Sequence, residues 1–140
     1  MTHLWTVRVY YEDVDLAGIV YYANYLRFIE RARSEMIRAA GIDQAAMRAA
    51  GHVFAVTRVE ADYLRPARYD DTLEIETSVA AVSRVRFVLE QTVRRDGTDL
   101  FRARVTIVCM DTDGRPRRLP AEVAGLQRIS ERAAPGRGWG

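Results

Sequence analysis

The stretch YYEDVDLAGIVYYANYLRFIERAR, residues 10–33, joins an acidic loop to the start of a helix. Its first half places Glu12, Asp13 and Asp15 ahead of Gly18. From residue 24 to residue 40, apolar side chains recur every three or four positions, which is the spacing of one buried helix face. Gly41 follows, as is typical of a helix end. The stretch therefore predicts a long amphipathic helix entered through a loop rich in carboxylates.

Five segments around this helix alternate apolar and polar residues with the period of two that indicates strands. They are residues 4–11, 53–64, 72–82, 84–95 and 100–110. Asp96-Gly97, between the last two, predicts a tight hairpin turn. The sequence therefore predicts an α+β fold in the order strand, helix, four strands, with a largely antiparallel five-stranded sheet wrapped around the helix. A short second helix is expected over residues 43–50.

Apolar residues also occur on the face of the sheet that is otherwise polar, namely Phe54, Val56, Leu64 and Val88. One helix is, moreover, a small cover for five long strands. Exposed apolar surface of this kind favours association between copies of a chain. We therefore expect a homodimer or a homotetramer.

Size and composition are those of an ordinary globular protein. The chain has 140 residues, of which 49% are hydrophobic and 29% charged. These values suit a single domain, expected over residues 1–130, followed by a disordered tail at residues 131–140. A net charge of +2 gives no footprint for nucleic acid. No apolar run is long enough for a transmembrane segment and no signal-peptide pattern is present, so a cytoplasmic location is expected.

The chain holds one cysteine and two histidines. Cys109 lies in an apolar run and is expected to be a buried, inert thiol. His3 and His52 are far apart in the sequence and near no cysteine. We therefore expect neither a metal site nor any cofactor.

The acidic loop allows a catalytic interpretation beside a structural one. The first N–H groups of a helix have no partner within it, so they stabilise a carbonyl that becomes an oxyanion. A carboxylate upstream, such as Asp15, can then act as nucleophile or base. A thiolate leaves more readily than an amine or an alkoxide, which makes thioester hydrolysis the compatible reaction. On pattern alone, however, acids ahead of a helix usually cap it or are solvated, and Asn24 is a candidate N-cap.

The same stretch closely resembles the signature of the hotdog-fold acyl-CoA thioesterases. Its nearest branches are the Tol-Pal-associated acyl-CoA thioesterases and 4-hydroxybenzoyl-CoA thioesterase. The similarity continues through YLRPARYDDTLEIET, residues 63–77, to about Leu119. The resemblance implies a hotdog fold, in which a sheet wraps around one long helix. It also implies hydrolysis of an acyl-CoA thioester.

Carried over by motif, the resemblance implies three catalytic positions. The family's catalytic aspartate falls on Asp15 in DVDLAG, its loop glycine on Gly18, and its carbonyl-binding backbone N–H on Tyr22. In the benzoyl-type relatives, residues at the start of the fourth strand hold the phosphates of CoA. The motif VSRVRF places three candidates there: Ser83, Arg84 and Arg86.

One departure at Tyr22 and two further residues, Asp13 and Glu60, bear on these assignments. Many Tol-Pal-type relatives carry histidine at the position of Tyr22, whereas tyrosine matches the benzoyl type, so the acyl group stays open between aliphatic and aromatic. Asp13 is the rival carboxylate, for which we expect a hydrogen bond to the loop or dipole complementation. Glu60 lies in a predicted strand and is interpreted as structural.

Acyl-CoA thioesterase is thus the leading hypothesis, with Asp15 as nucleophile or general base. Three alternatives stay open. A binding module for acyl-CoA or acyl carrier protein would use the same pocket without turnover. A hydratase or dehydratase on this fold normally needs a histidine together with the carboxylate. A structural role beside an envelope complex is suggested only by the family's genomic association.

Overall fold

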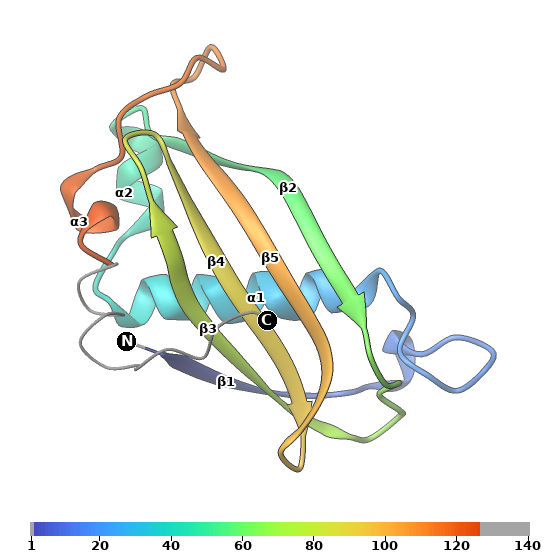
Figure 1. Cartoon of the computed structure of the whole chain (residues 1–140). Coiled ribbons are helices and arrows are strands. Elements are labelled where there is room, and N and C mark those ends of the chain that lie inside the picture. The colour runs from blue at the N-terminus through green and yellow to red at the C-terminus, as the bar shows by residue number, and fades with distance from the viewer. Residues whose placement is uncertain (1, 127–140) are drawn as a thin grey trace.

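The computed structural model describes residues 2–126, and its elements follow the predicted order (Figure 1). The helices are α1 (Asn24–Ala39), α2 (Gln44–Ala49) and a short α3 (Ala121–Ala124). The strands are β1 (His3–Arg8), β2 (Val53–Tyr63), β3 (Thr72–Val82), β4 (Arg86–Arg95) and β5 (Thr98–Met110). The α+β order is confirmed, whereas α3 was not expected. The predicted tail lies outside the described residues, and a single domain over residues 1–130 stays a prediction.

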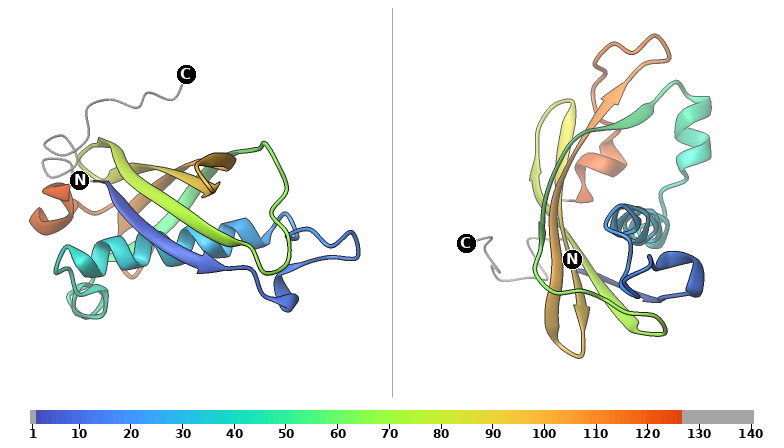
Figure 2. Two further views of the ribbon diagram at one scale, coloured as in Figure 1. Left: turned by 90° about the horizontal axis from the view of Figure 1, so that it is seen from below. Right: turned by 90° about the vertical axis from the view of Figure 1, so that its right-hand side faces the viewer.

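The strands form one antiparallel sheet in the order β1-β3-β4-β5-β2. Figure 2 shows this sheet as a curved layer with α1 against its concave face. The predicted apolar stripe of α1 is buried there through Tyr25, Phe28, Ile29, Ala32 and Met36. No helix within residues 2–126 is long and apolar enough to span a membrane.

The first strand is shorter than the sequence predicts. It ends at Arg8, and Tyr11 begins a 3-10 turn with a side chain that is 83% exposed. The cause is local hydrogen bonding. The Asp13 side chain accepts a hydrogen bond from the Tyr10 N–H at 2.8 Å, and the Asp13 N–H donates to the Tyr10 carbonyl at 3.0 Å. Because the turn uses these groups, they cannot continue the ladder with β3.

Strand β2 carries an irregularity that alternation cannot reveal. Its pairing with β5 shifts between Val56 and Arg58, so one extra residue lies between them. An extra residue reverses which face the following side chains occupy. Phe54 precedes the extra residue, so it lies on the opposite face from the one that strict alternation along the whole strand predicts, and the prediction that it lies on the polar face is wrong. Its ring lies 6.1 Å from the Phe87 ring and packs against the core. Val56 likewise pairs with the buried Ile107.

A polar residue lies in the middle of the core. Gln91 on β4 is fully buried and donates from Nε2 to the Ile29 carbonyl at 2.7 Å and to the Thr77 hydroxyl at 3.0 Å. Its Oε1 is buried without a partner among the described residues. Ile29 belongs to α1, so Gln91 ties the helix to the sheet by a bond that alternation of apolar residues does not predict.

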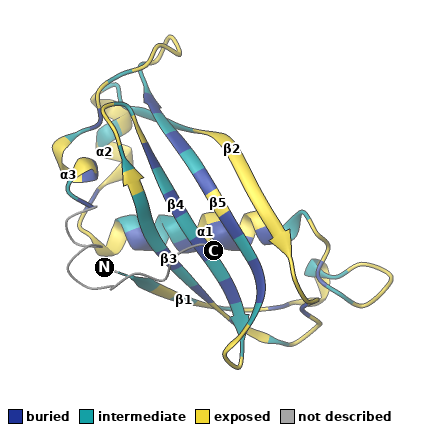
Figure 3. Cartoon of the chain, viewed as in Figure 1, coloured by how far each residue is buried: buried dark blue, intermediate teal, exposed yellow. Residues whose placement is uncertain are grey.

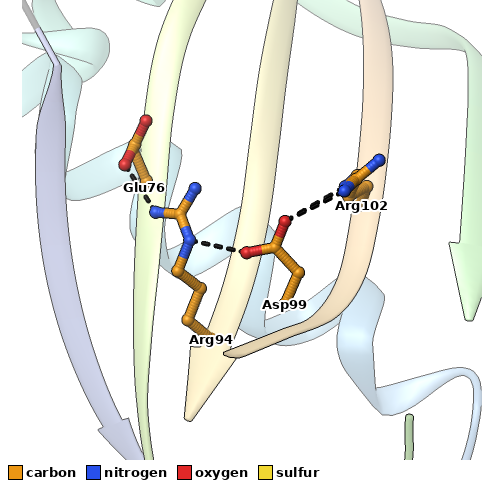
Figure 4. Close-up of polar contacts among 4 residues, drawn as sticks. All are labelled: Glu76, Arg94, Asp99 and Arg102. Atoms are coloured by element: carbon orange, nitrogen blue, oxygen red, sulfur yellow. Dashed lines mark hydrogen bonds and ion pairs between the residues drawn. The ribbon is translucent and has the colours of Figure 1, made fainter. Parts of the chain in front are cut away.

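The convex face of the sheet carries an ion-pair chain (Figure 4). Arg94 Nε lies 2.7 Å from Asp99 Oδ1, Arg102 pairs with the other oxygen of Asp99 at 3.1 Å, and Arg94 also pairs with Glu76. Burial alone would raise the pKa of Asp99, but hydrogen bonds from Arg94 and Arg102 outweigh it and hold that pKa below its usual range. The network joins three neighbouring strands on the side away from α1.

Candidate active site

The segment between β1 and α1 folds into a short hairpin at the N-terminal end of α1 (Figure 1). Val14 and Val20 form an antiparallel bridge, and the Tyr21 N–H donates to the Asp13 carbonyl at 2.9 Å. Ile19 forms a second bridge, to the connection between β2 and β3. These bonds turn the predicted loop into an ordered arm that leads back to α1.

Asp15 lies at the exposed end of this hairpin. Its Oδ1 accepts a hydrogen bond from the Ala17 N–H at 2.8 Å, and its carbonyl accepts one from the Gly18 N–H at 2.9 Å. Within residues 2–126, its Oδ2 has no hydrogen-bond partner. Gly18 has φ +77°, in the left-handed region, and a Cβ there would meet nothing within 4 Å. The turn therefore needs glycine for its backbone conformation, and it leaves one carboxylate oxygen of Asp15 free.

Asp13 is occupied by the backbone. Its carboxylate holds the Tyr10 N–H, as described above, and its carbonyl accepts a hydrogen bond from the Asn24 side chain at 3.1 Å. The expected hydrogen bond to the loop is confirmed. Glu60 is also accounted for, because it pairs with Arg58 at 3.0 Å on the exposed strand β2.

Helix α1 begins without a side-chain cap. Its N-cap is Ala23, so the expectation that Asn24 is the N-cap is wrong; Asn24 is the first helical residue and tethers the helix to the hairpin instead. By contrast, the Asp43 side chain caps α2. In the described part of the chain, the N–H groups of Tyr22 and Ala23 donate to no acceptor. The positive end of α1 is therefore open to an anion or a developing oxyanion.

Tyrosine side chains surround this helix start and divide into two kinds. Tyr25 is buried and stacks on Phe101 with ring centroids 4.8 Å apart, so the packing interpretation is confirmed for it. Tyr21 and Tyr22 are largely exposed, with ring centroids 5.0 Å apart. Tyr63, at the end of β2, has its ring 6.2 Å from that of Tyr22. These rings give the helix start an apolar, aromatic surround.

The residues predicted to bind phosphate lie at the other end of the sheet. Ser83 and Arg84 lie in the turn between β3 and β4 and Arg86 begins β4; the Ser83 N–H donates to the Arg86 carbonyl at 2.8 Å. Strand β4 is 10 residues long, about 30 Å. Its other end, at Arg95, contacts the β2–β3 connection that pairs with the hairpin. Within one chain, the structure therefore does not bring these arginines to Asp15.

His52 and Cys109 are also distant from Asp15. The Cys109 thiol is buried, as predicted, and lies 3.8 Å from His52 Nδ1. Burial raises the pKa of this thiol above its usual value, and the nearby Arg117 opposes the shift only in part. The raised pKa favours the protonated, unreactive thiol. His52 precedes β2, whereas the hairpin lies near the end of β2. Within residues 2–126, no group of three or more His, Cys, Asp or Glu side chains is placed to hold a metal ion.

One flank of the site is an edge of the sheet. Figure 3 shows β2 exposed over most of its length, and Val56, Val59 and Tyr63 on it are each at least 40% exposed. An edge strand has unpaired backbone N–H and C=O groups along one side. Apolar side chains on such an edge favour pairing with another strand.

A curved antiparallel sheet of five strands around one long helix is the architecture of the hotdog fold. Residues 9–127 match the family model of the thioesterase-like superfamily, and the chain belongs to this family. The matched range covers the hairpin, α1 and all strands except β1. The chain is accordingly an enzyme of the thioester hydrolase type.

Named relatives agree with this assignment. The chain is 42% identical over 121 residues to the acyl-CoA thioester hydrolase YbgC of Escherichia coli O157:H7, a match that covers 85% of this chain and 90% of the relative. It is 39% identical over 119 residues to the acyl-CoA thioesterase YbgC of Haemophilus influenzae, covering 84% and 88%. A crystal structure titled "Probable Thioesterase" from Bartonella henselae superposes with a TM-score of 0.81 at 37% identity, covering 86% and 100%.

Proposed function

We propose that the chain hydrolyses acyl-CoA thioesters at the start of α1, in the cytoplasm. The observation that carries the proposal is the uncapped start of α1, whose Tyr22 and Ala23 N–H groups are free, joined by one short hairpin to Asp15 with a free carboxylate oxygen. The relatives named as acyl-CoA thioesterases support the choice of substrate.

In the proposed reaction, the thioester oxygen points at the Tyr22 N–H and gains negative charge as the carbonyl carbon is attacked. Asp15 attacks that carbon directly, or it takes a proton from a water that attacks. The carbon–sulfur bond then breaks and CoA leaves as thiolate. In the first route, water cleaves the acyl-aspartyl anhydride and regenerates Asp15; in the second, the acid forms at once. Transfer of ¹⁸O from solvent into Asp15 during turnover would identify the first route.

A second copy of the chain is part of the proposal. The exposed edge of β2 favours antiparallel pairing with its counterpart, which gives a homodimer; two dimers would form a homotetramer. Antiparallel pairing places the start of one β2 beside the end of the other. The β3–β4 turn of one copy then lies at the same end as the hairpin of the other. Ser83, Arg84 and Arg86 are proposed to hold the phosphates of the CoA bound at the partner's Asp15.

Complementation tests this arrangement. Asp15→Asn and the double variant Arg84→Glu/Arg86→Glu should each be inactive alone. After the two are unfolded together and refolded, random pairing gives mixed dimers with one complete site, so about a quarter of wild-type activity should return. Failure to recover activity, with mixed dimers present, would place both sets of residues in one copy.

The primary test is release of free CoA, followed with a thiol-reactive dye. The panel runs from acetyl-CoA to palmitoyl-CoA and includes benzoyl-CoA and 4-hydroxybenzoyl-CoA, which decides between aliphatic and aromatic acyl groups. Asp15→Asn should lower kcat by at least about 100-fold. Asp13→Asn is the matched control, because its amide oxygen can still hold the Tyr10 N–H, and it should keep kcat within about threefold.

Other outcomes identify the alternatives. Near wild-type kcat in Asp15→Asn would remove Asp15 from the mechanism. If wild type binds the CoA esters without releasing thiol, the chain is a binding module. If it neither binds nor cleaves them, acyl carrier protein becomes the carrier to assay. Water addition to an enoyl-CoA would indicate a hydratase.

A further inference from the structure

Tyr63 connects the end of β2 to the start of α1. Its hydroxyl donates a hydrogen bond to the Tyr22 carbonyl at 2.9 Å, across 41 positions of sequence. In the described part of the chain, no backbone N–H donates to that carbonyl, and the Leu26 N–H donates to the carbonyl of the N-cap Ala23 at 3.2 Å. The carbonyl directly before the N-cap is thus held by a side chain from the sheet.

The hydrogen bond fixes one peptide plane at the site. The Tyr22 carbonyl and the Ala23 N–H belong to the same planar trans peptide group and point in opposite directions. Holding the carbonyl therefore sets the direction of the Ala23 N–H. The preceding peptide is held separately, because the Tyr21 carbonyl accepts a hydrogen bond from the Asn24 N–H at 2.8 Å. Together the two constraints orient two adjacent free N–H groups.

The Tyr63 ring is placed firmly enough to act in this way. It makes edge contacts with the rings of Tyr25 and Phe101 at centroid distances of 5.6 and 5.0 Å, and both of those rings are buried. The pKa of the Tyr63 hydroxyl is raised above its usual value, mainly by burial and further by the neighbouring Tyr22 and Tyr25. The hydroxyl therefore remains a donor throughout the neutral pH range.

We propose that Tyr63 is a positioning residue for catalysis, which aligns the free N–H groups at the start of α1 with the oxygen of the reacting thioester. The inference rests on the proposed function. An oxyanion forms only in the transition state, so misaligned donors lower kcat while substrate binding is largely kept. Tyr63 also lies on the β2 edge, so its effect must be separated from an effect on pairing.

The test is Tyr63→Phe, which keeps the ring and removes the hydroxyl. We expect kcat to fall about tenfold and KM to change by less than about twofold. The ¹⁵N–¹H resonance of the Ala23 amide should also shift in the free protein, a readout that requires no turnover. The control is Tyr25→Phe, which removes a hydroxyl of the same cluster whose partner is the Ala67 N–H at 3.1 Å. It should lower the Tm and keep kcat within about twofold.

Each outcome has one meaning. Unchanged kcat in Tyr63→Phe, with wild type active, overturns the role of Tyr63 and leaves the proposed function intact. Equal losses of kcat in both variants would assign Tyr63 to stability, and a loss that sedimentation shows to come from dissociation would assign it to pairing. Either result also overturns the positioning role of Tyr63. Absence of turnover in wild type refutes the proposed function itself, and an unshifted Ala23 resonance would then refute the role of Tyr63 on structural grounds.

Discussion

Replacing Gln91 by glutamate would put a carboxyl group where the protein buries an amide. Gln91 is fully buried, and its Nε2 lies 2.7 Å from the Ile29 carbonyl oxygen. A carboxylate has no hydrogen to donate, so two acceptors would face each other without water between them. The protonated acid can still donate one hydrogen bond to Ile29. The Gln91→Glu variant should therefore fold with this carboxyl neutral and its pKa well above the value of about 4.3 for an unfolded chain.

The sign and the size of the effect follow from proton linkage. With a folded-state pKa above the unfolded one, the folded protein binds the extra proton, and stability falls as pH rises between the two pKa values. The slope is about 1.4 kcal/mol per pH unit, so the variant should lose about 2.7 kcal/mol relative to wild type between pH 5 and pH 7. Such a loss is a large part of a typical stability of about 5–15 kcal/mol.

Urea unfolding of wild type and variant at half-unit steps from pH 4.5 to pH 7.5 measures this difference. Subtracting wild type at each pH removes the contributions of all other groups. Gln91→Met is the control: it loses both donated hydrogen bonds but also removes the unpartnered Oε1, and its difference from wild type should not change with pH. A flat difference for Gln91→Glu would refute the reasoning, because it would mean that water reaches this position.

Three further outcomes are expected. Gly18→Ala should cost about 1–2 kcal/mol in urea unfolding through its φ of +77° alone, and a larger loss would reveal a contact that the space around it does not show. In the Asp99→Asn variant, stability should fall less steeply than in wild type as the pH is lowered. The Asp99 pKa is depressed in the folded state, so the stabilisation from its carboxylate is present above the unfolded pKa of about 3.9 and is lost as pH falls through the folded value. Thermal melts from pH 5 to pH 2 test this, and identical slopes for variant and wild type would contradict it. Asp43→Ala should lower stability by about 1 kcal/mol, since Asp43 caps α2, and an unchanged urea midpoint would show that the cap contributes nothing.

Much of the architecture was predictable because it depends on local periodicity. The stripe in residues 24–40 gave α1, the alternating runs gave five strands, and Asp96-Gly97 gave the hairpin, in which both residues adopt positive φ. Errors occurred where a local feature interrupts a period. The 3-10 turn at Tyr11 shortened β1, and the extra residue near Val56 reversed a face of β2.

The candidate site was predictable only in part. The motif around Asp15 and Gly18 directed attention to the loop that the structure shows as a hairpin, and the resemblance implied a role for the Tyr22 N–H, which stays a prediction. The hydrogen bond that Asp13 makes to the loop was expected and is local, but the sequence could not reveal that Tyr63 reaches the Tyr22 carbonyl. That contact spans 41 positions and follows no local pattern. It exists because the end of β2 passes the start of α1.

By itself, the sequence determined the elements and their order, because hydrophobic periodicity and turn residues act within a few positions of the chain. It also determined which residue types were available at the loop, including Asp15. Only the tertiary structure decided what each one contacts. Packing of α1 against the sheet brought the Ile29 carbonyl to Gln91, and the pairing of the strands kept Ser83, Arg84 and Arg86 at the end of β4 opposite the hairpin. Such contacts depend on how elements distant in sequence come together, and no local pattern encodes them.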